Sequence, residues 1–243
     1  MKDLLQEKIK KYSNQDKMLS LYIVVASILV VGILYIVDQR FLVSYNTKII
    51  IKLILFSVVP FVYIKLSKDN FVKKSFKNHT PALKMDISKA LGIFVVIVLI
   101  IGFIIFRNLF DVNTIVYDFR NKYQIVGNQI LYYGLYLSFV NSLLEELFFR
   151  GFIFLGLKHI NCTKFGYIFS SFMFSIYHIA NFKNWFNPLV FILCLVGLFI
   201  GGLIFAALDD KKDTFFNSWF VHICADLAIV AIGYYVINIS AGL

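Results

Sequence analysis

Long apolar stretches recur along the sequence and constrain what this chain can fold into. About 18 or more mostly apolar residues can cross a bilayer as an α-helix. Candidate runs of this kind cover roughly residues 19–37, 49–66, 87–106, 125–157, 165–179, 189–208 and 215–239. A soluble chain of 243 residues that is 60% hydrophobic would expose enough apolar surface to aggregate. The sequence therefore predicts an all-α, polytopic transmembrane bundle of about seven helices.

Basic residues lie mainly between these runs, where the positive-inside rule accounts for them. Lysines are frequent before residue 18 and between residues 65 and 84, so both regions are expected to face the cytosol. We therefore predict a multi-pass plasma-membrane protein with a cytoplasmic amino terminus and, despite a net charge of +10, no nucleic-acid partner. The Lys-rich, Arg-poor composition favours a bacterial source. Eight spans are the alternative, if the fourth run breaks near Asn141 and Ser142.

Polar groups are distributed unevenly between the two halves of the chain. The first three runs carry almost nothing polar in their centres, whereas all candidate catalytic groups fall between Glu145 and Asp226. We therefore expect residues 1–120 to form a scaffold of three spans and their loops, and residues 121–243 to form the catalytic core. Within the core, Gly197 and Gly201, extended by Gly202, favour close helix packing inside the molecule over dimerisation.

Two adjacent acids in the fourth run are the first candidate site residues. Ionisable side chains at membrane depth are costly and are by default a functional-site hypothesis. Glu146 and Arg150 are four residues apart, so on a helix they form an ion pair. Glu145 points about 100° away, without a cation in its own segment, and suits a general base or acid. A purely structural Glu-Arg pair would leave Glu145 without a role.

Two histidines in later runs complete the constellation. His178 ends an aromatic-rich helix, while His222 and Asp226 are four apart, so the carboxyl group could orient the imidazole or a bound water. Each histidine alone could be a structural residue of a helix interface. A rise of about 1.5 Å per residue nevertheless brings Glu145, His178 and His222 to comparable depth in the bilayer.

The order of these motifs resembles the CPBP family, the CAAX-protease and bacteriocin-processing intramembrane proteases, also called the Abi family. The resemblance covers about Tyr133 to Leu227 and includes Glu-Glu-x-x-x-Arg, Phe-x-x-x-His from Phe174 to His178, and His-x-x-x-Asp. It implies that Glu145 activates a water with help from His178, while His222 and Asp226 stabilise the oxyanion. It also implies that Glu146, Arg150 and Phe174 support the site. An ionised Asp226 would repel an oxyanion, so it could instead be protonated, orient His222 or bind a metal.

Metal dependence is open at this point. Glu145, His178 and His222 could hold zinc in the open, three-ligand manner of catalytic centres, and the family is often labelled metalloprotease. However, the sequence has no H-E-x-x-H motif, and the ligands would come from three helices. We favour a glutamate-activated water that needs no cofactor, with a divalent metal such as zinc as the alternative.

The resulting hypothesis is an intramembrane endopeptidase that cuts membrane-associated or lipid-modified peptides or proteins. Its partners would be membrane lipid and a peptide or protein substrate, and the bacterial reading points to processing of secreted or signalling peptides. The alternative is a non-catalytic bacteriocin-immunity or regulatory protein of the same fold that binds its partner in the membrane. The sequence does not determine the oligomeric state.

Overall fold

The computed structural model is a bundle of helices. It describes residues 2–40, 45–67, 75, 82–122, 129–182, 185–211 and 213–241. It is 93% helical, and the described residues contain no strand, although an isolated bridge pairs Phe110 with Phe186. The predicted all-α class is therefore confirmed, and its several long apolar helices make the chain an integral membrane protein.

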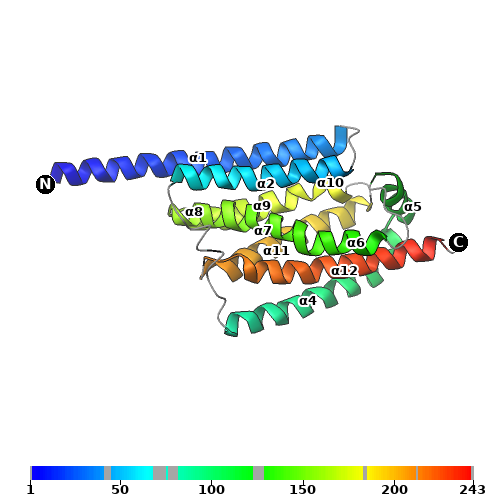
Figure 1. Ribbon diagram of the computed structural model, residues 1–243. Helices are drawn as coiled ribbons and strands as arrows, with labels where there is room; N and C mark the ends of the chain where they lie inside the picture. Colours follow the sequence, from blue (N-terminus) through cyan, green and yellow to red (C-terminus); the bar gives the residue numbers. More distant parts are fainter. Residues whose placement is uncertain are drawn as a thin grey trace.

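The long helices run side by side, and the two termini lie at opposite ends of the bundle (Figure 1). In chain order the helical elements are α1 (Lys2–Arg40), α2 (Tyr45–Ser67), α4 (Ala82–Phe106), the 3₁₀ turn η1 (Arg107–Leu109), α5 (Val112–Tyr117), the π-helix η2 (Asp118–Lys122), α6 (Gln129–Leu135), the π-helix η3 (Tyr136–Asn141), α7 (Ser142–Glu146), the π-helix η4 (Leu147–Leu155), α8 (Gly156–His159), α9 (Thr163–Tyr177), α10 (Ile179–Phe182), α11 (Pro188–Asp210) and α12 (Phe216–Ala241).

The elements from α6 to α8 join into one central helix, residues 129–159, in which α- and π-helical pairing alternate. Asn141 (φ −64°, ψ −45°) and Ser142 (φ −62°, ψ −37°) both have right-handed helical backbones. The helix is therefore continuous at the point where an eighth span would begin. From Phe148 to Leu155 each side chain is buried, which places this helix inside the bundle.

Within the described residues, five helices are long and apolar enough to cross a membrane. They are Asn14–Gln39, Asn46–Ser67, Asp86–Leu109, Pro188–Asp210 and Phe216–Ile237. The fourth predicted run is divided between α- and π-helical segments, and α9 has only 15 residues. The predicted total of about seven spans therefore stays a prediction.

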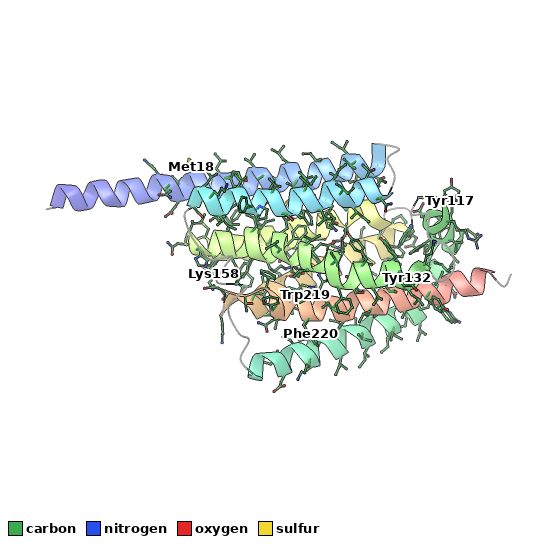
Figure 2. All side chains as sticks on the ribbon, viewed as in Figure 1. Met18, Tyr117, Tyr132, Lys158, Trp219 and Phe220 are labelled. Atoms are coloured by element: carbon green, nitrogen blue, oxygen red, sulfur yellow. The ribbon has the colours of Figure 1, made fainter. Side chains whose placement is uncertain are left out.

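Lys158 lies at the end of the bundle from which α1 extends (Figure 2). The ammonium of Lys158 lies 3.0 Å from Asp210 Oδ1 and 2.8 Å from Asp213 Oδ1. The hydroxyl of Thr214 donates to the carbonyl oxygen of Ser75, at 3.1 Å. These contacts join the connections after α2, α8 and α11.

Two hydrogen bonds join described residues near the other end of the bundle. The Gln39 amide donates to the carbonyl oxygen of Ala180 at 3.1 Å, and the Trp185 indole donates to Asp118 at 2.8 Å. Tyr117 lies at this end and Lys158 at the opposite one (Figure 2). Which end of the bundle faces the cytoplasm stays a prediction.

Helices of the amino-terminal half pack directly on the carboxy-terminal half. Helix α4 lies along α12, where a Cβ atom at Gly92 would come within 2.8 Å of the Cys224 sulfur. Helices α1 and α2 contact η4 on the side of the bundle away from α4. The predicted division at residue 120 stays a prediction, but the two parts share one core.

Candidate functional site

Both adjacent acids lie deep inside the bundle, at the carboxy-terminal end of α7. The exposed fraction is 2% for Glu145 and 0% for Glu146. Two successive positions of a helix can both be buried here because other helices surround the central helix. Leaving a carboxylate in such a place costs several kcal/mol unless it has partners. The partners of each oxygen therefore define the site.

One oxygen of Glu145 faces both predicted histidines. Its Oε2 atom lies 3.7 Å from Nε2 of His178 and 3.8 Å from Nε2 of His222. This oxygen accepts no hydrogen bond from the described residues, although it is buried. The structure thus brings together the acid and the two imidazoles that the sequence assigned to one site, and it leaves an acceptor directed between the rings.

The other oxygen of Glu145 is held by three donors. The Lys52 ammonium donates to Oε1 at 2.7 Å, the Asn141 amide at 2.8 Å and the Tyr177 hydroxyl at 3.3 Å. Lys52 also donates to the amide oxygen of Asn141. These contacts fix the plane of the carboxylate and determine which of its oxygens faces the imidazoles.

His178 has a defined tautomer. Its Nδ1 lies 2.8 Å from the carbonyl oxygen of Phe174, one turn earlier on α9. A carbonyl oxygen can only accept, so Nδ1 carries the hydrogen and the neutral ring presents a lone pair at Nε2. That lone pair lies on the side of Glu145 Oε2, where it can accept a proton or a hydrogen bond.

Glu146 orients His222. The Nδ1 atom of His222 lies 2.7 Å from Glu146 Oε1, whereas its Nε2 atom lies 3.7 Å from Asp226 Oδ1. The hydrogen bond that fixes the ring therefore comes from the central helix, although the sequence pattern had offered Asp226 for that role. Asp226 is 8% exposed and lies beside the outer nitrogen of the ring.

Arg150 and Phe174 form the layer beneath this constellation. Arg150 is fully buried, and its Nε lies 3.3 Å from Glu146 Oε2, as the four-residue spacing predicts. The guanidinium lies 4.1 Å from the centre of the Phe174 ring, a cation–π distance. The same ring packs edge-on against His178, with centroids 4.6 Å apart. Phe174 thus supports both the cation and the imidazole.

Lys52, Asn141 and Tyr177 are the contributors that the sequence reasoning missed. Lys52 lies near the start of the predicted run 49–66, outside its centre, and projects from α2 to the site. Its signal was present, because Lys52 lies inside the apolar run 49–66, whereas the other lysine of that run, Lys65, lies at its end. Asn141 could have been found from its position one turn before Glu145.

A structural or catalytic metal ion needs three or more side chains placed to bind it together. The part of the chain that the structure describes includes no group of three His, Cys, Asp or Glu side chains arranged to hold one. Ligands at about 2.0–2.1 Å from a tetrahedral zinc lie roughly 3.4 Å apart, less than the two spacings around Glu145 Oε2. Glu145, His178 and His222 would therefore have to move closer together to hold zinc.

A family model, the Rce1-like type II CAAX prenyl endopeptidases, matches residues 127–228. This segment holds all three motifs from Glu145 to Asp226. It belongs to the CPBP family. No curated protein and no solved structure matches the chain. The match confirms the family resemblance, and it suggests a CAAX-type membrane protease. Lys52 lies outside the matched residues.

Proposed function

We propose that this protein is an intramembrane endopeptidase that hydrolyses peptide bonds with a water activated by Glu145. The single observation that carries the proposal is the position of Glu145 Oε2, 3.7 and 3.8 Å from the two imidazole nitrogens. A buried carboxylate oxygen directed between two proton-transfer groups is a place where a water can be bound and deprotonated. The CPBP assignment supports the same reaction class.

The reaction follows from the partners of each group. Glu145 removes a proton from the water as its oxygen bonds to the carbonyl carbon of the substrate, with His178 holding that water through Nε2. The carbonyl oxygen becomes an oxyanion, which protonated His222 stabilises from Nε2 while Glu146 keeps the ring in place. The carbon–nitrogen bond then breaks, and Glu145 returns its proton to the leaving amine.

Asp226 has a limited place in this mechanism. A charged carboxylate beside the oxyanion would repel it, whereas a protonated carboxyl group could donate a hydrogen bond to it. Asp226 is buried and lies 3.7 Å from the imidazole that would carry positive charge. We propose that it stabilises protonated His222 before the attack, in the manner of an orienting acid.

The proposed substrates are membrane-associated or lipid-modified peptides or proteins. The site lies in the core of a bundle whose outer helices expose large apolar side chains, so a substrate would reach it from the lipid phase. We further propose a bacterial plasma-membrane location, a cytoplasmic amino terminus, and a role in processing secreted or signalling peptides. The distribution of lysines between the spans supports the orientation.

The test is cleavage by purified protein in detergent. The probes are an internally quenched peptide with a farnesylated CAAX terminus, the same peptide without farnesyl, and an apolar leader-type peptide. Glu145→Gln is expected to lower kcat by on the order of 10²- to 10⁴-fold, because it removes the base. Asp38→Asn serves as the matched control, since it breaks an ion pair with Lys48 outside the site.

Two results would contradict the proposal. Cleavage by Glu145→Gln at the wild-type rate would remove the assigned base. Failure of the folded wild-type protein to cut any of the three probes, combined with tight binding of one of them, would favour the non-catalytic binding role.

A further inference from the structure

We infer that Lys52 of α2 is a positioning residue for Glu145 and completes the site from outside the family core. The inference rests on the proposed function, since it concerns the orientation of the proposed base. Lys52 lies 75 residues before the matched segment begins at residue 127. The structure shows its ammonium 2.7 Å from Glu145 Oε1.

The geometry assigns a different task to each oxygen of Glu145. Lys52 and Asn141 both donate to Oε1, and Lys52 also donates to the Asn141 amide oxygen, so the three groups form a closed triangle. A carboxylate held through one oxygen by two charge-assisted or amide donors cannot rotate freely. The second oxygen is therefore kept toward the Nε2 atoms of His178 and His222.

Burial of Lys52 requires a partner of this kind. Its side chain is 12% exposed, and that of Glu145 is 3% exposed. A lysine near the end of a span usually extends toward the interface. Here the ammonium instead turns inward, and it lies 4.9 Å from the Tyr177 ring centre and 5.3 Å from the Phe56 ring centre. The ammonium group therefore lies between the two aromatic rings and the carboxylate of Glu145.

The consequence is that the amino-terminal helices are part of the chemical site. A scaffold helix that only supported the core could lose a polar side chain without affecting the reaction. Loss of Lys52 would leave Glu145 buried with one fewer donor and free to turn. Misplacement of a reacting group by about 1 Å can lower the rate about 100-fold.

A double-mutant cycle in thermal stability tests the pair without any substrate. Wild type, Lys52→Met, Glu145→Gln and the double variant are melted in detergent, with tryptophan fluorescence as the readout. Lys52→Met is expected to lower Tm because it leaves a buried carboxylate unpaired, and adding Glu145→Gln is expected to restore part of the loss. Additive changes in Tm would overturn the inference, whatever the protein does to peptides.

Kinetics on the farnesylated CAAX probe test the positioning role. Lys52→Met is expected to lower kcat about 10- to 100-fold with little change in KM, and Lys52→Arg is expected to recover part of kcat. Lys48→Met is the matched control, because it removes a lysine one turn away that pairs with Asp38 at 3.1 Å. The positioning role would be overturned if the changes in Tm were non-additive but the kcat of Lys52→Met equalled that of wild type.

These readouts separate the two proposals. If wild-type protein cuts none of the probes, the proposed function fails, and the Tm cycle alone then decides whether Lys52 holds Glu145. If wild type cuts the probe while the cycle is additive, the protease proposal stands and the inference about Lys52 fails.

Discussion

Glu146 and His222, 76 positions apart in the sequence, are joined by a contact of 2.7 Å between Oε1 and Nδ1. The second acid of the Glu-Glu pair is therefore a partner of the last histidine as well as of Arg150, to which its other oxygen turns. One carboxylate thus links the central helix to α12. This link explains why two adjacent acids are kept at a depth where each is costly.

Replacing Glu146 with glutamine should impair catalysis and also lower stability, because the buried Arg150 loses the carboxylate that faces it. The amide keeps the size of the side chain but loses the charge that favours protonated His222, so kcat should fall by about 100-fold with little change in KM. Kinetics on the farnesylated CAAX probe would measure this change. Asp38→Asn is the control, because it breaks an ion pair with Lys48 that lies outside the site. Equal kcat values for wild type and Glu146→Gln would contradict the prediction.

The sequence predicted that the site residues lie close together, because the topology of the spans and the depth of each residue follow from span lengths and the positions of lysines. Span lengths and the positions of lysines place Glu145, His178 and His222 at similar heights in a slab. The four-residue spacing also predicts the contact between Glu146 and Arg150 correctly. Each of these inferences uses distance along one helix axis, which the rise per residue fixes.

The partners between helices could not be predicted in this way. The contact of Lys52 with Glu145 depends on how α2 is rotated about its axis, and hydropathy says nothing about rotation. Hydropathy does not give the number of spans for a related reason. The segment from Phe148 to Leu155 is mostly apolar because other helices surround it. The hydropathy of a sequence does not distinguish such a helix from one that faces lipid.

Helix packing at Gly202 should be intolerant of a methyl group. A Cβ atom there would lie 2.8 Å from Cβ of Ser171 and 2.9 Å from its Cα, on the helix that leads to His178. Gly202→Ala should therefore cost about 1–3 kcal/mol and lower Tm. Gly201→Ala is the matched control, because nothing lies within 4 Å of its Cβ position. Equal melting temperatures for the two variants would show that α9 and α11 can separate freely.

The contacts of Lys158 should make the stability of the folded protein fall as the pH rises in the alkaline range. Burial by itself would lower the pKa of Lys158, but Asp213 and Asp210 outweigh it and raise the pKa above its usual value. A raised pKa in the folded state gives stability that is complete below the unfolded pKa, about 10.4, and that is lost as pH rises through the folded pKa.

The measurement is Tm against pH for wild type and Lys158→Met. The difference between them should be constant from about pH 7 to 9 and should narrow above about pH 10. Lys164→Met, at an exposed lysine on α9, is the control and should follow the wild-type curve. A difference that stays constant at all pH values would mean that packing of the side chain, and not its charge, stabilises this end of the bundle.

Proteolysis should persist when divalent metals are removed. The spacings of 3.7 and 3.8 Å around Glu145 Oε2 exceed those of a tetrahedral zinc site, and the Lys52 ammonium at 2.7 Å from the same carboxylate would repel a dication. Cleavage of the probe by protein dialysed against EDTA and then assayed with 1,10-phenanthroline should keep the wild-type rate. Rate loss that added zinc reverses would contradict this prediction, because it would mean that the side chains rearrange around a metal.

In that case Lys52→Met should bind zinc more tightly than wild type, since the competing cation is gone. Calorimetric titration of both proteins with zinc would measure the difference.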